Sequence, residues 1–394
     1  MPESVDVAIV GAGAMGASIA FHLAEHGAGS VLVLDERHVA SGATGSSSGL
    51  VRMHYTFPPE VRLALASLDY FESWEERLGR PSTFRRTGFL RIVPPSQAER
   101  LRANVAMQRE CGVHTRVVTR DELRELEPGW WLDDLEVAAW EPDSGYADAA
   151  VVASDFLACA RERGVRYRPG CRVRSLRVER GRVTGVETDS GFVAAGTVVV
   201  AAGAWSRVLL QQADLDLPLE CEYHEVVILE RPAGCEQPDR ACVDSSLGIY
   251  FRPEGPGQAL VGGFEGPRSL EPRRDVPEPE PDAFTGKLRR AARRIPALAD
   301  AGIVGSVTGY YTMTPDHRAL LGPLPDVERL FCCTGFSGMG FKVSPAIGLV
   351  MSEWILDGRS RTVDVAAFRP DRFARGEPIH PPHEYEIDRL DLDA

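Results

Sequence analysis

The chain opens with a pattern that strongly limits its fold. The apolar run VDVAIV (residues 5–10) is followed by the glycine sequence GAGAMG, the helix-length stretch ASIAFHLAEHG and a second apolar run, VLVL (residues 31–34). Two runs of strand length separated by a helix-length segment predict a βαβ unit. Because strands buried on both faces read as continuous apolar runs, we expect these two to lie parallel inside a sheet covered by helices.

Three glycines between the first strand and the helix form a GxGxxG motif. Gly11 allows a tight turn, Gly13 lets the backbone approach a pyrophosphate, and Gly16 lets the helix and the strand pack closely. Asp35 follows the second strand, where an acid accepts hydrogen bonds from ribose hydroxyls. A turn of small residues that only packs is the alternative, but the strand, the helix and the acid together favour a dinucleotide site.

The motif alone does not distinguish NAD from FAD, and three features favour FAD. The motif lies within the first 16 residues, a Gly/Ser/Thr turn (residues 41–49) follows the ribose acid directly, and only one full fingerprint is present. Such a turn suits the additional phosphate and the flavin ring. A third apolar run within residues 195–206 predicts another buried strand, and it too ends in glycine.

Composition excludes several classes of protein. The net charge of −13 argues against nucleic-acid binding, and no apolar run approaches the length of about 18 residues typical of a membrane span. The N-terminus lacks a basic leader and the eight cysteines are scattered, so we expect a cytoplasmic protein with reduced thiols, Cys332 and Cys333 among them as buried thiols. No metal-ligand motif is present, and no metal is expected.

Helical patterns cover about residues 58–78, 97–111 and 148–163, the last with Asp148 as its cap. Paired strand patterns occupy residues 217–231 and 248–264, and the Pro-rich stretch 271–282 is expected to be a surface loop. The last 20 or so residues are polar and contain proline, and no structure is expected for them.

Six segments together resemble one protein family: VAIVGAGAMG, VLVLDE, SGATGSSSGLVRMHY, VVVAAGAWS, GYYTMTPDHRALLG and CTGFSGMGFKVSPAIG. They are similar to FAD-dependent amine and amino-acid oxidases of the D-amino-acid oxidase superfamily, nearest to sarcosine oxidase and glycine oxidase, over about residues 5–365. The resemblance implies an α/β fold with a Rossmann-like FAD-binding domain of the glutathione-reductase type and an α+β substrate domain on a mixed β-sheet. The FAD domain would combine residues 1–50, 145–215 and 305–370, the substrate domain residues 51–144 and 216–304, and residues 371–394 would form a tail.

The resemblance also implies roles for individual residues. Only two of the 44 basic residues are lysines, and one of them, Lys342, matches a family lysine that pairs with the substrate carboxylate; Arg52 matches the arginine that does the same. A surface lysine after a turn is the alternative for Lys342. Tyr250 and Tyr311 are candidate pocket residues beside the substrate amine, or core tyrosines. His224 and His317 are candidates for the same pocket, although a structural role is the more usual one for a lone histidine.

The glycine turn before Lys342 is expected to lead into a helix whose N-terminus faces the flavin. The full set of expected cofactor-binding residues is Gly11, Ala12, Gly13, Met15, Gly16, Asp35, Glu36, Arg37, Ser41, Thr44, Ser47, Ser48, Val173, Ala202, Gly203, Trp205, Gly309, Gly338, Met339, Gly340, Phe341 and Lys342.

The chain departs from the family pattern at several positions. Gly309 stands where some sarcosine oxidases have a flavin-linked cysteine, so we expect noncovalent FAD. Val261 and Glu265 stand in place of a lysine and a histidine, and Gly49 in place of an arginine, which suggests a roomier, more apolar pocket. The positive charge that assists oxygen reduction is then expected from one of three residues: His54, Arg252 or Lys342.

The expected activity is oxidation of glycine or an N-substituted glycine to an imine, which is hydrolysed to glyoxylate and an amine while O2 becomes H2O2. A nitrogen substituent larger than methyl is favoured. A dehydrogenase with a non-oxygen acceptor, a 2-hydroxy-acid oxidase and a flavin subunit that needs a partner chain remain alternatives. We expect a monomer or a small homo-oligomer that uses an amino-acid substrate with a carboxylate.

Overall fold

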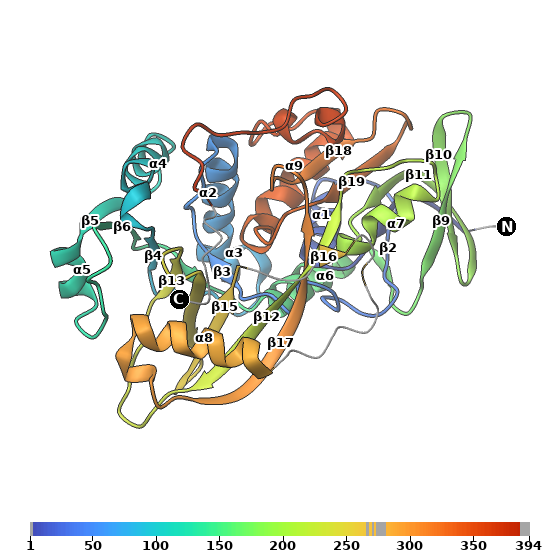
Figure 1. Ribbon diagram of the computed structural model, residues 1–394. Coiled ribbons are helices and arrows are strands. Elements are labelled where there is room, and N and C mark those ends of the chain that lie inside the picture. Colours follow the sequence, from blue (N-terminus) through green and yellow to red (C-terminus); the bar gives the residue numbers. More distant parts are fainter. Residues whose placement is uncertain (1–2, 265–267, 270–271, 273–280, 387–394) are drawn as a thin grey trace.

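Two β-sheets organise the chain in the computed structural model, which describes residues 3–264, 268–269, 272 and 281–386. Figure 1 shows one sheet among helices α1, α6 and α9, and the other beside helix α8. Glu265, most of the predicted loop at 271–282 and the last part of the tail (387–394) lie outside the described residues.

The first sheet is built on the predicted βαβ unit. Strand β1 pairs in parallel with β2, helix α1 connects them, and five neighbouring strands of this sheet are parallel. Its strands, in spatial order, are β18 (Leu320–Pro323), β19 (Leu330–Thr334), β11 (Gly191–Val200), β1 (Glu3–Val10), β2 (Val31–Leu34) and β8 (Arg166–Arg168), with β10 (Arg182–Thr188) on β11 and β9 (Val173–Glu179) on β10. Helices α1 (Ala14–Glu25), α6 (Ala149–Glu162) and α9 (Ser344–Asp357) pack over one face. This sheet matches the expected Rossmann-like half.

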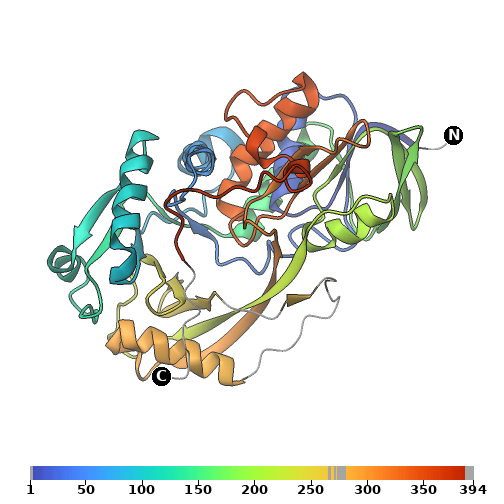
Figure 2. The same ribbon diagram turned by 45° about the horizontal axis from the view of Figure 1, so that its top comes forward.

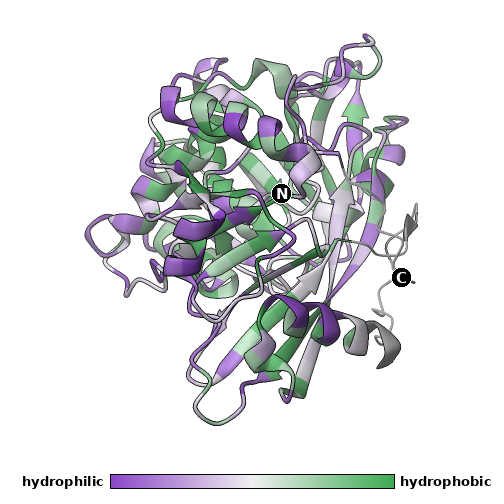
Figure 3. Cartoon of the chain, turned by 60° about the vertical axis from the view of Figure 1, so that its left-hand side comes forward, coloured by the Kyte–Doolittle hydropathy of each residue, from purple (hydrophilic) through white to green (hydrophobic). Residues whose placement is uncertain are grey.

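The second sheet is mixed, as expected for the substrate half. Its strands are β16 (Arg268–Ser269), β12 (Glu220–Glu230), β15 (Gln258–Gly263), β14 (Ile249–Glu254), β13 (Ala241–Asp244), β4 (Phe89–Ile92), β6 (Val137–Glu141) and β5 (Arg116–Thr119), with β17 (Gly302–Met313) on β12. Only β13 and β4 run parallel among its pairs in the described part of the chain. Helix α8 (Pro281–Arg294) covers one face and presents its polar side outward (Figure 3).

Strand alternation gives the second sheet two distinct faces. Leu90, Ile92 and Phe251 point toward α8, whereas Phe89 and Tyr250 belong to a separate cluster on the opposite face. This opposite face, called the inner face below, is the one that carries the candidate site. Strand β17 is hydrogen-bonded along most of β12 although the predicted FAD domain includes residues 305–370, so the exact domain boundaries remain a prediction.

The helices fall close to the predicted ranges. The pattern at 58–78 forms α2 (Pro58–Glu72) and α3 (Trp74–Leu78), and the pattern at 97–111 contains α4 (Ala98–Glu110). Asp148 caps α6, since its Oδ1 accepts hydrogen bonds from the backbone of Ala150 at 2.9 Å and Val151 at 3.0 Å. The remaining elements are α5 (Arg120–Leu126), α7 (Ser206–Gln211), the strand pair β3 (Leu50–Val51) and β7 (Gly145–Tyr146), and the 3-10 turns η1 (Pro95–Gln97), η2 (Gly203–Trp205), η3 (Pro296–Leu298), η4 (Phe341–Val343), η5 (Ala366–Phe368) and η6 (Pro370–Arg372).

The predictions about membrane spans and about cysteines can be compared with the described residues. None of their helices has both the length and the apolar character needed to cross a bilayer. All eight cysteines are free, and Cys332 and Cys333 are buried on opposite faces of the first sheet, as predicted for β-strand thiols.

The expectation of an unstructured tail is wrong for residues 371–386. Figure 2 shows this segment crossing from the first sheet toward α4. It is anchored by the buried Asp316, whose carboxylate accepts hydrogen bonds from Arg372 Nε at 2.8 Å, Arg372 Nη2 at 2.7 Å and the Ile379 backbone at 2.9 Å. The polar composition of the tail therefore reflects partners that lie far away in the sequence.

Replacing Arg372 by methionine is expected to lower the free energy of unfolding by about 3–5 kcal/mol, because it leaves the Asp316 carboxylate buried without its bidentate partner. Burial alone would raise the pKa of Asp316, but the hydrogen bonds from Arg372 and the backbone outweigh it and lower the pKa. This contribution is therefore present at neutral pH and begins to be lost as the pH falls below 3.8. Urea unfolding of the FAD-bound protein measures it, with Arg375→Met as control. The exposed Arg375 makes two surface ion pairs, with Asp371 and Glu377, each worth under about 1 kcal/mol. Equal stability of the two variants would contradict the prediction.

Candidate active site

The predicted cofactor residues gather where the parallel strands of the first sheet end. Gly11 follows β1 and Asp35 follows β2, and the Asp35 carboxylate accepts hydrogen bonds from the backbone of Ala12 and Arg37, both at 2.8 Å. Gly11 has φ +109°, and a Cβ there would overlap the Ala201 carbonyl oxygen beyond β11. The glycine is thus required by the close approach of two strand ends.

Helix α1 begins at this edge without a side-chain cap. Its N-cap residue is Gly13, and a Cβ there would meet only Thr44 Oγ1 at 3.2 Å, so space is open in front of the helix. Thr44 Oγ1 accepts a hydrogen bond from the Ala14 backbone at 3.0 Å. Apart from this hydrogen bond to Thr44, no side chain covers the first turn at Gly13, and such a helix N-terminus fits a pyrophosphate. The residues present therefore fit FAD.

Other predicted cofactor residues lie around the same opening. The turn after β11 contains Ala202, Gly203 and Trp205, and Thr334 Oγ1 donates to the Gly203 carbonyl oxygen at 3.1 Å. A Cβ at Gly340 would lie 3.0 Å from Met15 Cε, so the glycine turn 335–340 lies beside the start of α1. The rest are Glu36, Arg37, Ser41, Ser47 and Ser48 in the loop after β2, Val173 at the start of β9, Gly309 beside Ser46, and Gly338, Met339 and Phe341 in or after the glycine turn.

Arg52 and Lys342 lie 290 positions apart in the sequence yet face the same aromatic ring. The Arg52 guanidinium carbon is 5.0 Å, and Lys342 Nζ 5.9 Å, from the centre of the Tyr55 ring. Arg52 is half-buried and donates to the His54 carbonyl oxygen, while Lys342 is only 5% exposed. Among the described residues, neither forms an ion pair with a carboxylate. Burial and the charge of Arg52 hold the pKa of Lys342 well below its usual 10.5.

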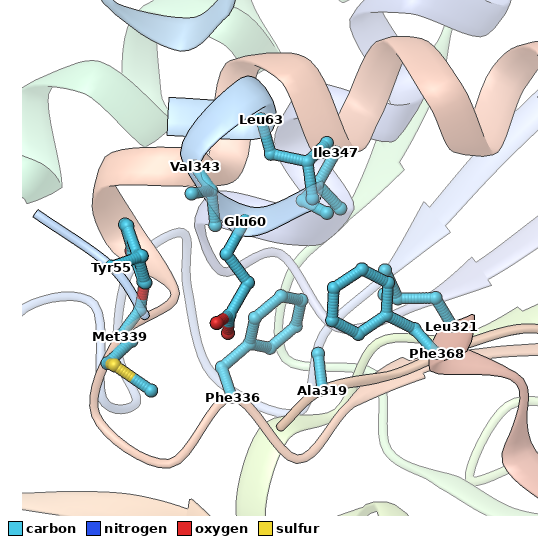
Figure 4. Close-up of a pocket in the computed structure, with 10 residues that line it drawn as sticks. All are labelled: Tyr55, Glu60, Leu63, Ala319, Leu321, Phe336, Met339, Val343, Ile347 and Phe368. Carbon is cyan, nitrogen blue, oxygen red and sulfur yellow. The ribbon is translucent and has the colours of Figure 1, made fainter. Parts of the chain in front are cut away.

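Glu60 is the carboxylate that influences the pKa of Lys342, but it forms an ion pair with another residue, Arg318. Its Oε2 lies 3.0 Å from Arg318 Nε, and burial raises the pKa of Glu60 to about 7. Figure 4 shows its carboxylate pointing into a small, mostly apolar cavity between Phe336 and Met339. Because Glu60 is partly protonated at neutral pH, it offsets the charge of Lys342 only weakly.

Two predicted tyrosines lie together on the second sheet. The hydroxyl groups of Tyr250 on β14 and Tyr311 on β17 are 3.4 Å apart; Tyr250 is buried and Tyr311 is half-buried. The Tyr311 ring stacks on His224 with ring centres 3.8 Å apart, and a Cβ at Gly338 would overlap the Tyr311 ring. The structure thus brings Tyr250, Tyr311 and His224 to the glycine turn that leads to Lys342. His317, which follows Thr314 in a tight turn, has φ +58°.

The structure bears on the three residues that were expected to supply positive charge near the flavin. Burial, with Arg91 and Arg52 nearby, holds the pKa of His54 well below 6.5, so His54 is neutral and supplies no charge at pH 7. Arg252 forms an ion pair with Glu254 at 2.6 Å and donates to the Ser48 carbonyl oxygen. Of the three candidates, only Lys342 has no carboxylate partner among the described residues.

The inferences from Val261 and Gly49 are also wrong. Val261 points to the α8 side of its strand, and its neighbour Leu260 occupies the inner face. Gly49 has φ +69°, and a Cβ there would overlap the Ala147 carbonyl oxygen, so glycine is a requirement of the backbone. Neither residue therefore reports on the size or polarity of the pocket.

Sequence reasoning named His54 but missed the residues that surround it beside Arg52, namely Glu141, Arg91 and Tyr385. His54 Nε2 is 2.8 Å from the Tyr385 hydroxyl, and His54 Nδ1 is 3.7 Å from Glu141 Oε1. The Arg91 guanidinium carbon lies 4.7 Å from the centre of the Tyr385 ring. No local pattern marks these residues, because Arg91 and Glu141 sit in short strands and Tyr385 comes from the tail.

A nucleotide-binding edge on a parallel sheet, next to a mixed sheet with buried tyrosines and cations, defines the class of two-domain flavoprotein oxidoreductases. The profile of the DAO family, described as FAD dependent oxidoreductase, matches residues 6–354. The chain belongs to this family, and its cofactor is FAD.

The chain is similar to mitochondrial sarcosine dehydrogenase from Mus musculus, at 27% identity over 91% of this chain and 40% of that protein. It therefore spans less than half the length of this curated relative. Among solved structures, L-proline dehydrogenase from P. horikoshii matches with a TM-score of 0.88 at 27% identity, over 96% of this chain and 100% of the other. Glycine oxidase from Geobacillus kaustophilus matches with a TM-score of 0.82 at 25% identity, over 94% and 99%. These similarities agree with the predicted branch of the family and with the predicted fold.

Proposed function

We propose that the protein oxidises the C–N bond of an N-substituted glycine. The observation that carries this proposal is the pair of cations, Arg52 and Lys342, that face one ring without a carboxylate partner in the described part of the chain. Two like charges buried together are costly unless an anion joins them. A substrate carboxylate is that anion, since an arginine fork and a lysine point charge bind it together.

The residues of the chain position the substrate. Arg52 and Lys342 hold the carboxylate in this proposal. The Tyr250 and Tyr311 hydroxyls, which burial keeps neutral by raising their pKa, hydrogen-bond the amine. When bound, FAD would accept the hydride equivalent, which carries both electrons, that leaves the α-carbon. Since the clamp fixes the orientation of the substrate, no side chain need act as a base.

The overall reaction balances with water and oxygen. An N-substituted glycine, O2 and H2O give glyoxylate, the free amine and H2O2. Oxidation first yields the imine, and water then hydrolyses it. Lys342 is the cation best placed to assist oxygen reduction. A second candidate, a dehydrogenase that passes electrons to another acceptor, is favoured by the names of two relatives, sarcosine dehydrogenase and L-proline dehydrogenase.

We further propose that FAD is held noncovalently, because Gly309 offers no nucleophile where some related enzymes link the flavin. The cofactor-binding set predicted above, from Gly11 to Lys342, supplies the backbone amides and the Asp35 carboxylate for this purpose. The domain ranges predicted from the sequence, with FAD between the two parts, belong to the same proposal.

Anaerobic mixing tests the proposed function. Sarcosine, glycine, longer N-alkyl glycines, D-alanine and a 2-hydroxy acid are each added to the yellow protein, and flavin bleaching near 450 nm (roughly, a property of the cofactor) is followed. N-substituted glycines should bleach it fastest. Faster bleaching by the hydroxy acid, or none without a second chain, would overturn the proposal. Comparing peroxide yield in air with turnover of a dye acceptor separates the oxidase from the dehydrogenase.

Carboxylate binding is expected to weaken as the pH rises. A bound carboxylate favours charged Lys342, whose pKa in the free site is held low by burial and by Arg52. Above that pKa, binding must take up a proton, so the Kd rises up to about tenfold per pH unit. Calorimetry with (methylthio)acetate, which lacks an amine, should show this slope and proton uptake. Lys342→Met should bind more weakly with no slope, and an unchanged slope would contradict the assignment.

A further inference from the structure

A third cation near the candidate site has no carboxylate partner in the described part of the chain. Arg91 on β4 is 9% exposed, its Nη1 donates a long hydrogen bond of 3.4 Å to the Val243 carbonyl oxygen, and its guanidinium lies over the Tyr385 ring. Burial lowers the pKa of Arg91 to about 10, Tyr385 opposes that shift, and the charge of Arg52 adds to it. A buried guanidinium with so few partners is costly unless it serves an anion.

The strand register places Arg91 on the inner face, beside the proposed substrate. Side chains two residues apart share a face, so Arg91 lies on the same side as Phe89, whose ring is 5.6 Å from the Arg52 guanidinium carbon. Across the sheet, Arg91 pairs with Val243, and Val243 pairs with Tyr250. Two strand spacings separate Arg91 from Tyr250, about 10 Å between Cα atoms.

The tail packs over the part of the candidate site formed by His54 and Arg91, called the Arg91 corner below. Three side chains near and on α4 hold it: Asn104 Nδ2 donates to the His383 carbonyl oxygen at 2.8 Å, Arg100 Nη1 to the Glu384 carbonyl oxygen at 2.6 Å, and Gln97 Nε2 to the Glu386 carbonyl oxygen at 2.8 Å. Tyr385 is thereby fixed between His54 and Arg91, with its ring stacked on His54 at 5.8 Å. Its hydroxyl, bonded to His54, is a second polar group in the Arg91 corner.

Two carboxylates of the same sheet, Glu141 and Asp244, bind groups other than Arg91. Glu141 Oε2 accepts hydrogen bonds from Ser144 Oγ at 2.7 Å and from the Met53 backbone at 3.0 Å. Asp244 pairs with the buried Arg294 at 2.7 Å. Arg91 therefore keeps its charge available to a ligand.

We propose that Arg91, with the Tyr385 hydroxyl, forms a second anion subsite, and that the substrate is an N-substituted glycine whose nitrogen substituent ends in a carboxylate. The inference rests on the proposed function and narrows its substrate class to secondary amines with two carboxylates. Arg52 and Lys342 hold the glycine carboxylate, and Arg91 holds the distal one. The substituent between them crosses the row of inner-face residues that leads from Tyr250 to Arg91.

Two unreactive ligands of similar size test the subsite on the FAD-bound protein by calorimetry. The diacid 3-(carboxymethylthio)propanoate, that is HOOC–CH2–S–CH2CH2–COOH, is compared with (isopentylthio)acetate, which lacks the distal charge. Wild type should bind the diacid at least tenfold more tightly. Arg91→Met should abolish this preference and leave the monoacid Kd within about threefold, Arg91→Lys should keep part of it, and Arg102→Met, an exposed residue of α4, should change neither.

Equal affinities in wild type would overturn the subsite even if Arg91→Met did not fold, and so would a preference that survives in a folded Arg91→Met. Anaerobic bleaching separates this outcome from failure of the proposed function. Bleaching by N-isopentylglycine as efficient as by N-(2-carboxyethyl)glycine overturns only the subsite. Bleaching by neither overturns the proposed function and the subsite with it.

Discussion

Replacing Arg52 or Lys342 by methionine should weaken binding of a carboxylate ligand by about 2–5 kcal/mol each, which is roughly 30- to 5,000-fold in Kd. Methionine keeps much of the side-chain length and the apolar contact with the Tyr55 ring, and it removes the charge. The loss is large because the partner carboxylate would remain in a buried site without water. Titration of the oxidised protein with (methylthio)acetate measures the change directly.

The second lysine of the chain supplies a matched control for this experiment. Lys287 on α8 is 6% exposed, similar to Lys342, but it pairs with Glu225 at 3.2 Å. Lys287→Met should therefore lower stability and leave the ligand Kd unchanged. Unchanged affinity in both Arg52→Met and Lys342→Met would remove the proposed orientation of the substrate. The double variant should lose more than the sum, since removing either cation relieves the repulsion that its neighbour feels and so partly offsets each single loss.

Gly13→Val should yield a folded protein that retains less than about a tenth of its FAD. The site has open space in front of the α1 N-terminus, and valine would fill it where the pyrophosphate must approach the backbone. The fold should survive, because the built Cβ meets only Thr44 Oγ1 at 3.2 Å, a contact that requires a small shift. The ratio of flavin to protein absorbance measures retention, and circular dichroism measures folding.

Two other glycines separate cofactor loss from misfolding. Gly129→Val, in a loop where a Cβ meets nothing within 4 Å, should retain FAD fully. Gly11→Ala should destabilise the chain itself, because the Cβ overlaps the Ala201 carbonyl oxygen and φ is +109°. Full flavin content in Gly13→Val would mean that the pyrophosphate binds elsewhere.

Much of the nucleotide half could be predicted from local patterns. The β1–α1–β2 unit, the position of Asp35 after β2 and the Asp148 cap of α6 each depend on residues within a short stretch of chain. Arg52 and Lys342 came from resemblance to a family, and the structure brings both to Tyr55. Their roles remain predictions until the ligand titrations are done.

The errors share one cause, which is the register of strands and the pairing of distant segments. Val261 and Leu260 are both apolar and adjacent, and only the pairing of β15 with its neighbours decides which one faces the site. A shift of one residue reverses every side chain in a strand. The tail was expected to be unstructured because its anchors, Asp316 and His54, lie 56 and 331 residues away.

The amino-acid order alone was sufficient to predict a dinucleotide-binding fold, because glycine turns, strand-length apolar runs and the acid after β2 are local requirements of binding a dinucleotide. The family itself came from the resemblance carried by six segments of the sequence. The amino-acid order was not sufficient to show that Arg91 and Tyr385 meet beside Arg52, or that Lys342 is buried without a carboxylate partner among the described residues. Those facts depend on which segments pack together, and packing is settled by the summed burial and hydrogen bonding of the whole chain. A charged side chain looks the same in the sequence whether it ends in water or in an apolar corner, and only the folded surroundings determine its pKa and its need for an anion.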